Sequence, residues 1–470
     1  MSDIIQDVYL THGWPNLALD IFTRAAIFNI EEDQSMHKLA IDGGTPIRTK
    51  GPIIESDVFE QEELEALIQV AKEKKLRRAE AALEYERVIA EWFNVKHAIA
   101  VSSGTTALHI ALAAFGIGPG DEVIVTPYTF VASDTCVLEQ NAIPIFADID
   151  PVHLTLDPED IARKITLRTK AIIPVTISGT PIDMDPIMDL AKKHDLWVLE
   201  DACQSLGATY KGQKIGTIGH VGVFSTITGK LTNTGEGGFV ITDDTELYDK
   251  MWSYMDFARD KSMGPASKYH WGLPCTNYRI TNMQAAIGIH QMNRLHAMIT
   301  KRTENALYLS EQLKDVPGIV LPSNPSFGER VYFYYLIRIQ PEILNSDMLN
   351  FALALAAEGI YDTRYLSTTR WMIPQHLEPL FVNKTGYGGT KCPFECPWYE
   401  GHVEYGPGLC PVAEKACEEV FWLASMHPLL EKSDLDDIAA AVKKIAYAFV
   451  EKKEKGIPVN YATDAHRAQL

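Results

Sequence analysis

Residues 97–149 read HAIAVSSGTTALHIALAAFGIGPGDEVIVTPYTFVASDTCVLEQNAIPIFADI. Three short apolar runs, HAIAV, EVIV and IPIF, are separated by two stretches whose apolar residues recur at helical spacing. Short strands separated by helices of about ten residues or more favour a parallel sheet with helices on both faces. In such sheets ligands bind at the carboxyl ends of the strands. The loops that follow these runs are therefore candidate site loops.

The same alternation continues on both sides of this stretch. After residue 149 the pattern predicts a helix in PEDIARKIT, a strand in AIIPVTI, a helix in MDPIMDLAKKH and a strand in LWVLEDA. Further strands are expected in GVFST and GGFVITD, followed by a long helix from about Thr281 to Leu313. Upstream, FEQEELEALIQVAKEKK is acidic early and basic late, which suits a helix dipole. The site loops are then SSGTT, TPYTF, ISGTP and EDACQ.

Changes in pattern divide the chain into four parts. Residues 1–36 are expected to be an N-terminal extension, and residues 37–300 a large domain that begins with the arm IDGGTPIRT. Residues 301–455 predict a smaller α/β domain, with a strand in VYFYYLIRI and a closing helix near the end. A long loop at 383–410 within it is rich in Gly, Pro and Cys, and residues 456–470 are expected to be a loose tail.

Charge and composition exclude several classes of protein. The formal net charge of -19 argues against a nucleic-acid binder, which would need a basic patch, and favours a soluble protein. No apolar run reaches the ~18 residues of a membrane helix, so no membrane partner is expected. The N-terminus has early acids and no basic segment, unlike a signal peptide. The cytoplasm is the expected compartment.

The seven cysteines have two readings. Their odd number in a long chain disfavours a secreted disulfide framework. Four of them, with His402, could suggest a metal cluster: Cys392, Cys396, Cys410 and Cys417. Their spacing matches no paired CxxC signature, and a proline follows both of the first two. We therefore predict no metal site.

Two of the site loops could bind parts of a flat, phosphorylated ligand. SSGTT, Ser102 to Thr106, lies between a strand and a helix, where backbone N–H groups and the positive end of the dipole can hold a phosphate. Taken alone, it is more simply a capped strand-to-helix turn. Phe130 leaves a strand end and could stack on a ring, although alone it is more simply a core residue.

Two further loops supply charged groups. Asp201 follows the apolar strand LWVL, where a carboxylate could keep a pyridine nitrogen protonated, and Gln204 could donate a hydrogen bond to the ring oxygen. The alternative for Asp201 is a helix cap. Lys230 follows a strand in FSTITGKLTNTGEGG; lysine forms Schiff bases, but most lysines are solvated surface residues. A cradle, an aromatic, a carboxylate and a lysine in this order resemble fold-type I pyridoxal-phosphate enzymes.

The successive motifs resemble one family, the DegT/StrS group of sugar aminotransferases. The similarity runs from about Leu39 to about Ala448 and includes PIFADID, TKAIIPV, LEDACQSLGA, GKLTNTGEGG and NYRITNMQAAIG. It implies a large domain with a mainly parallel seven-stranded sheet and a smaller C-terminal domain. It also implies pyridoxal 5'-phosphate as cofactor and a homodimer with shared active sites.

The resemblance implies a role for each matching residue. Lys230 would carry the cofactor as a Schiff base and shuttle protons, and Asp201 would pair with the pyridine nitrogen. Gln204 would contact the ring oxygen and Phe130 the ring face. Asn277 would reach the phosphate of the neighbouring subunit's cofactor. The phosphate itself would be held by residues of the cradle and of the strand before the lysine: Gly104, Thr105, Thr106 and Ser225.

Three departures from the family pattern affect the substrate. Thr226 stands where a second aromatic is frequent, and Thr176-Ile177-Ser178-Gly179 where a His-x-Tyr-Gly segment is frequent. KKLRRAEAALEYER lacks the glycines common there. We expect these to be positions in the substrate-binding wall. GKL around the lysine is closer to the enzymes of cyclitol and antibiotic pathways than to those acting on nucleotide sugars.

The expected activity is a ping-pong transfer of an amino group from Glu or Gln to a keto-sugar or keto-cyclitol. A dehydratase branch of the family has His in place of the lysine, so Lys230 disfavours it. A synthase branch that dehydrates an aminated ring retains the lysine and stays open. A regulator that binds the cofactor without turnover also stays open.

Overall fold

The computed structural model describes residues 38–51, 53, 58–259, 274–360, 373–424 and 426–463. The N-terminal extension predicted at 1–36 and residues 464–470 of the expected tail lie outside the described residues.

The large sheet has seven strands in the order β1-β9-β8-β5-β4-β2-β3. Neighbours from β3 to β8 are parallel, whereas β9 is antiparallel to both β8 and β1. The predicted mainly parallel seven-stranded sheet is confirmed. The six strands other than β9 run in one direction, so their carboxyl ends lie on the same side of the sheet. The strands are β1 (His97–Val101), β2 (Glu122–Val125), β3 (Ile143–Phe146), β4 (Thr169–Ile172), β5 (Trp197–Asp201), β8 (Val221–Ser225) and β9 (Gly238–Thr242).

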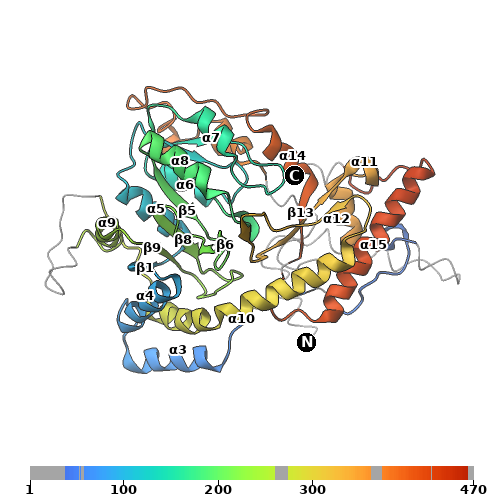
Figure 1. Cartoon of the computed structure of the whole chain (residues 1–470), viewed down its shortest axis with the longest axis horizontal. Coiled ribbons are helices and arrows are strands. Elements are labelled where there is room, and N and C mark those ends of the chain that lie inside the picture. Colours follow the sequence, from blue (N-terminus) through green and yellow to red (C-terminus); the bar gives the residue numbers. More distant parts are fainter. Residues whose placement is uncertain are drawn as a thin grey trace.

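Helices cover both faces of this sheet (Figure 1). Because side chains alternate along a strand, Ile99 and Val101 face one core with α5, α6 and α9, whereas Ala98 and Ala100 face another with α4 and α8. Most residues of the seven strands are apolar and buried, as expected for a sheet covered on both sides, and Lys170 of β4 is an exposed exception. The helices are α3 (Gln61–Glu73), α4 (Glu80–Phe93), α5 (Gly104–Ala114), α6 (Ala132–Glu139), α7 (Pro158–Lys164), α8 (Met184–His194) and α9 (Thr245–Met255).

A smaller domain follows, built on an antiparallel sheet of order β10-β12-β13. Its core is apolar and includes Phe351, Phe421 and Phe449. A third small sheet, of order β11-β6-β7, joins residues from both halves of the chain. The elements are β6 (Thr209–Tyr210), β7 (Gln213–Lys214), β10 (Ile319–Val320), β11 (Gly328–Glu329), β12 (Tyr335–Ile339), β13 (Val420–Ala424), α11 (Pro341–Leu344), α12 (Met348–Ala357) and α15 (Lys432–Glu454).

One long helix, α10 (Asn282–Leu313), belongs to both domains. Thr281 caps it through a capping box with Gln284, close to the predicted start. Its first half contributes Met292 and Leu295 to a core of the large domain, and its second half contributes Leu309 to the core of the small one. In Figure 1 it runs from beside α4 to α15. The boundary expected near residue 300 therefore falls inside a continuous helix.

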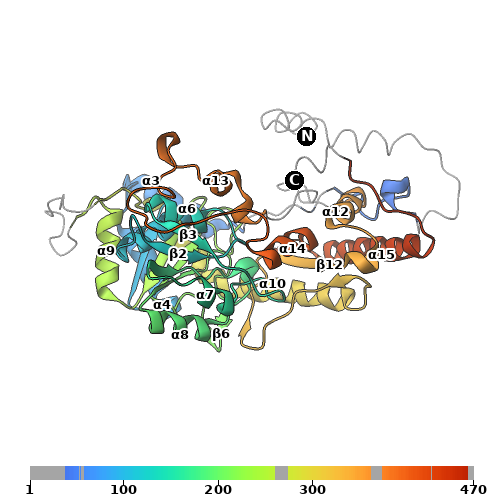
Figure 2. The same ribbon diagram turned by 90° about the horizontal axis from the view of Figure 1, so that it is seen from above.

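The loop predicted at 383–410 packs against the large sheet rather than the small one. Its aromatic residues Phe394 and Tyr405 lie in the same core as β2 and β3, and the Tyr405 hydroxyl donates to the carbonyl of Pro144 in β3 (2.8 Å). Its apolar side chains are buried beside β3, the last strand of the sheet, so the loop covers that edge strand. In Figure 2 its ribbon runs beside β3. We call residues 373–419 the insert; it contains η4 (Gln375–Leu377), α13 (Pro379–Val382), η5 (Tyr387–Gly389) and α14 (Pro411–Glu419).

The four cysteines of the insert do not converge on one point. Cys392 and Cys396 form a disulfide, whereas Cys410 and Cys417 are buried in the core of the large domain. Within the described ranges, no group of three His, Cys, Asp or Glu side chains is arranged to hold a metal ion. Across the same ranges, no helix is long and apolar enough to span a membrane.

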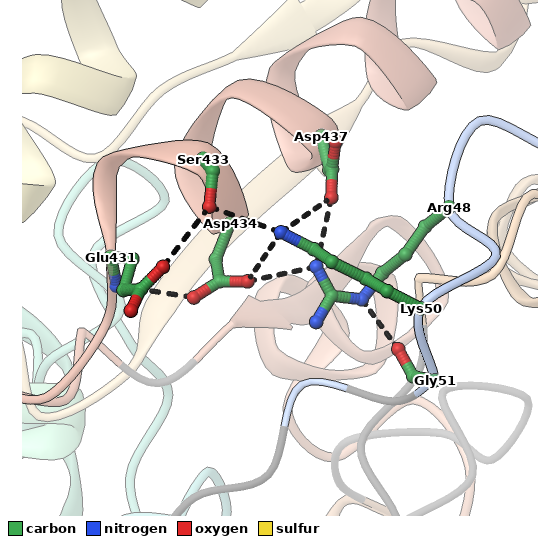
Figure 3. A network of polar contacts seen from close by, with 7 residues as sticks. All are labelled: Arg48, Lys50, Gly51, Glu431, Ser433, Asp434 and Asp437. Atoms are coloured by element: carbon green, nitrogen blue, oxygen red, sulfur yellow. Dashed lines mark hydrogen bonds and ion pairs between the residues drawn. The ribbon is translucent and has the colours of Figure 1, made fainter.

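The N-terminal arm is tied to the small domain by a buried carboxylate. Glu358 accepts hydrogen bonds from the backbone N–H groups of Ala40 (2.8 Å) and Ile47 (3.0 Å), and from Lys444 Nζ of α15 (2.9 Å). Beside it, Arg48 forms ion pairs with Asp434 and Asp437, both at 2.8 Å (Figure 3). The arm is thus held by the last helix of the fold.

Replacing this carboxylate tests its contribution to stability. Glu358→Ala should lower the free energy of unfolding by about 3–5 kcal/mol, because Lys444 would keep a buried charge without its counterion. Glu84→Ala removes a carboxylate from an exposed pair with Arg87 and should change it by less than about 1 kcal/mol. Urea unfolding of the three proteins measures both changes, and equal effects would contradict this role of Glu358.

Candidate active site

Most of the predicted site residues lie at the carboxyl edge of the large sheet. Asp201 ends β5 and Ser225 ends β8. The SSGTT turn follows β1, and Phe130 follows β2. Four strands that end on the same side of the sheet therefore bring together loops that lie far apart in the sequence.

The first turn of α5 contains the residues predicted to form a phosphate cradle. Ser103 is its N-cap: the Ser103 hydroxyl accepts from the N–H of Thr106, and the Thr106 hydroxyl accepts from the N–H of Ser103, both at 3.1 Å. The N–H groups of Gly104 and Thr105 have no acceptor within the helix and remain for an anion. Thr106, predicted to bind the cofactor, has its hydroxyl in this cap, and its contact with the cofactor stays a prediction.

Gly104 allows the cradle to lie directly against the end of β8. A Cβ at residue 104 would be 2.8 Å from the Cβ of Ser225 and 3.1 Å from the sulfur of Cys203. A Cβ at Gly238 would likewise be 2.7 Å from the backbone nitrogen of Gly104. Burial raises the pKa of the Cys203 thiol well above its usual value, so the group beneath the cradle is a neutral thiol.

Asp201 is buried and oriented by two hydrogen bonds. Its Oδ2 accepts from the hydroxyl of Ser133 in α6 (2.7 Å), and its Oδ1 accepts from the N–H of Cys203 (3.2 Å). Only 4% of the residue is exposed. The sequence analysis missed Ser133, because a serine in a helix carries no signal of a contact with a distant strand.

Gln204 presents its amide group as the predicted contact requires. Its Oε1 accepts from the N–H of Ser178 (2.8 Å), which leaves the two N–H bonds of the amide as donors. Ser178 has φ 53°, a left-handed conformation that directs its N–H to Gln204. The ISGTP loop therefore lies next to EDACQ, where Ser178 orients the amide of Gln204.

Two of the departures expected to line the substrate wall are directed into the fold. The Thr226 hydroxyl is 2.7 Å from that of Thr234, and the Thr176 hydroxyl donates to the backbone carbonyl of Asp201 (3.2 Å). Both residues are buried. Their hydroxyls make hydrogen bonds within the fold and so stabilise the loops that carry the site, rather than facing a substrate.

Lys230 lies in a tight loop next to an aromatic ring. Gly229 before it has φ 91°, and the Lys230 N–H donates to the carbonyl of Ile227 (3.0 Å). Its Nζ is 4.5 Å from the ring centre of Phe333, a residue just before β12 that sequence analysis did not single out. A pocket beside it is lined by Gly229, Lys230, Leu231, Asn233, Gln291, Met298, Arg302, His427, Pro428 and Val58.

Phe130 and Asn277 are both accessible. Phe130 is 64% exposed, so the alternative reading as a core residue is wrong. Asn277 is exposed and forms an isolated bridge with Asp256, and the next residue, Tyr278, accepts a hydrogen bond from the N–H of Ser102 (2.9 Å). Its contact with a neighbouring subunit stays a prediction.

Comparison with known proteins identifies this arrangement. Residues 57–395 match the DegT/DnrJ/EryC1/StrS aminotransferase family. The chain belongs to this family. Its members are pyridoxal-phosphate-dependent sugar aminotransferases, and the chain has the α/β fold of that group.

Individual relatives extend over most of the chain. It is 31% identical to the spore coat polysaccharide biosynthesis protein SpsC of Bacillus subtilis, over 82% of this chain and 94% of that protein. It is 41% identical to a GDP-perosamine synthase of Caulobacter vibrioides, over 55% and 68% respectively. A solved aminotransferase structure from Psychrobacter cryohalolentis has a TM-score of 0.73 at 31% identity, covering 84% of this chain and 99% of that one.

The cradle can be tested directly. Gly104→Ala should weaken the binding of pyridoxal 5'-phosphate at least about tenfold, because the added methyl group would push α5 away from Ser225. Gly118→Ala is the matched control, since a Cβ there meets nothing within 4 Å. Absorbance titration of the two apoproteins gives both dissociation constants. Equal constants would exclude the cradle as the phosphate site.

Proposed function

We propose that this chain transfers an amino group from glutamate or glutamine to a keto-sugar or keto-cyclitol in a ping-pong reaction, with pyridoxal 5'-phosphate attached to Lys230 as a Schiff base. The main observation behind this proposal is that Gly104 packs directly against Ser225. Ser225 lies five residues before Lys230 in the chain. This observation supports a cradle for the phosphate beside the loop that carries Lys230, a residue type that forms Schiff bases.

The donors and acceptors of the site fit each part of that cofactor. The N–H groups of Gly104 and Thr105 and the hydroxyl of Ser225 would hold the phosphate. Asp201, already oriented by Ser133 and Cys203, would hold a proton on the ring nitrogen. The free N–H bonds of Gln204 would reach the ring oxygen, and the exposed ring of Phe130 would cover one face.

The bound cofactor would supply an electron sink for the carbon that loses its proton. Lys230 would serve first as the attachment point and then, once displaced by the amino donor, as the base and acid that moves the proton. The ring of Phe333 at 4.5 Å gives its ammonium group an apolar neighbour. The segment that leads into β12 thus contributes a wall on the lysine side.

We propose a homodimer in the cytoplasm as the working form. Asn277 would reach the phosphate of the partner's cofactor, and its exposure next to the segment that bonds Ser102 supports that role. A keto-sugar acceptor is supported by the family and by the relative that makes GDP-perosamine, and the GKL motif supports a keto-cyclitol.

The first half of the reaction tests Lys230. When glutamate or glutamine is added to the loaded protein, the cofactor absorbance near the visible range should bleach. Lys230→Ala should lose this bleaching by a factor of about 10³ or more, since it removes both the attachment point and the base. Lys211→Ala removes an exposed lysine paired with Asp185 and should bleach like the unmodified chain. A Lys230→Ala protein that still turned over would refute the mechanism.

The second half distinguishes the substrates. Among nucleotide-linked keto-sugars and inososes supplied to the aminated enzyme, at least one should give an amine that retains all its ring oxygens except the replaced ketone oxygen. Mass analysis of the products reads this out. A dehydrated product would favour the synthase branch, and bleaching by the donor with no acceptor consumed in the panel would leave only half of the proposal standing.

A further inference from the structure

The insert contacts the backbone of the loop that presents Phe130. The N–H of Gln375 donates to the carbonyl of Pro127 (2.9 Å), and its side-chain Nε2 donates to the carbonyl of Thr129 (3.3 Å). Gln375 is only 6% exposed. The two bonded carbonyls lie three residues and one residue before Phe130, so the insert holds the loop from which this ring projects.

A second set of hydrogen bonds starts at the side-chain hydroxyl of Thr129 and leads to Asp201. The hydroxyls of Thr129 and Ser133 are 2.8 Å apart, and the Ser133 hydroxyl donates to Asp201 Oδ2 at 2.7 Å. A hydroxyl has one proton, and that of Ser133 is directed at the carboxylate, so Thr129 must donate to Ser133. All three residues are at least nine-tenths buried. The direction of the two hydroxyl bonds is therefore defined, from Thr129 to the carboxylate, and the insert is joined to them through the backbone of Thr129.

The start of this chain is itself anchored. His376, next to Gln375, is fully buried, and its Nε2 is 2.9 Å from Oε1 of Glu414 in α14. Glu414 also accepts from the N–H of Gly408 (2.8 Å). η4 is thus held against α14 while Gln375 holds the Phe130 loop.

We propose that Gln375 is a positioning residue for the cofactor, acting through Thr129 on both Phe130 and Ser133–Asp201. This inference rests on the proposed function, in which Phe130 and Asp201 contact the cofactor. Without the Nε2 donor the carbonyl of Thr129 loses a buried bond, the 127–130 loop shifts, and the hydroxyl pair that orients Asp201 lengthens. The insert then serves the chemistry of the large domain although it lies between two strands of the small one.

The test compares full-length variants in their affinity for pyridoxal 5'-phosphate, measured by absorbance titration of apoprotein. Gln375→Met keeps the length of the side chain and removes its donor, and Ser133→Ala removes the bond to Asp201. Each should raise the dissociation constant roughly five- to twentyfold. The double variant should be no more than about twofold weaker than the weaker single one, because both act along one chain.

Tyr405→Phe is the matched control. It removes another bond from the insert to a backbone carbonyl of the large domain, at Pro144, outside the chain to Asp201. It should leave the dissociation constant within about twofold of the unmodified protein. The circular dichroism of the bound cofactor should change in Gln375→Met and not in Tyr405→Phe, since it reports the orientation of the ring and not the stability of the fold.

The outcomes are separable. Equal affinities and spectra in Gln375→Met and Tyr405→Phe, or a double variant whose effect is the product of the two single effects, would overturn the inference. If Gln375→Met does not fold, Gln375→Leu, which also lacks the Nε2 donor, carries the same expectation. An unmodified protein that binds no pyridoxal 5'-phosphate would instead refute the proposed function.

Discussion

The site depends on one close approach, the seating of Gly104 against the end of β8. β1 and β8 are not neighbours, because β9 lies between them. The helix that follows β1 can still reach the last residue of β8, since neither Gly104 nor Gly238 has a side chain to keep them apart. Once α5 is seated there, the loop from Ser225 to Lys230 must begin next to the free N–H groups of the helix.

Much of this arrangement was predictable because its signals are local. Strands of apolar residues, helices at 3.6 spacing and glycine-rich turns are all encoded within a few residues, and the order of the motifs specified the family. The antiparallel direction of β9 was not predictable, because GGFVITD has the same pattern in either direction. Ser133 and Phe333 were missed for a related reason: their importance lies in contacts made across the fold.

The division into domains was the least predictable feature. Residue 300 lies within α10, and a helix that supplies two cores has no change of composition to mark where one domain ends. The insert lies within the small domain in sequence, between β12 and β13, yet Phe394 and Tyr405 are buried on the large sheet. Aromatic residues in a loop show that some surface will cover them, but they do not specify which one.

The pairing of β12 with β13 also affects how the chain is made. β12 ends at Ile339 and its partner β13 begins at Val420, and the intervening chain includes the insert, which packs on the large sheet. During synthesis one side of β12 therefore stays without its partner strand until β13 has been translated. The N-terminal arm acquires its ion-pair partners even later, because Lys444, Asp434 and Asp437 belong to α15. We therefore expect the small domain to close last, with the first and last parts of the translated chain completing it together.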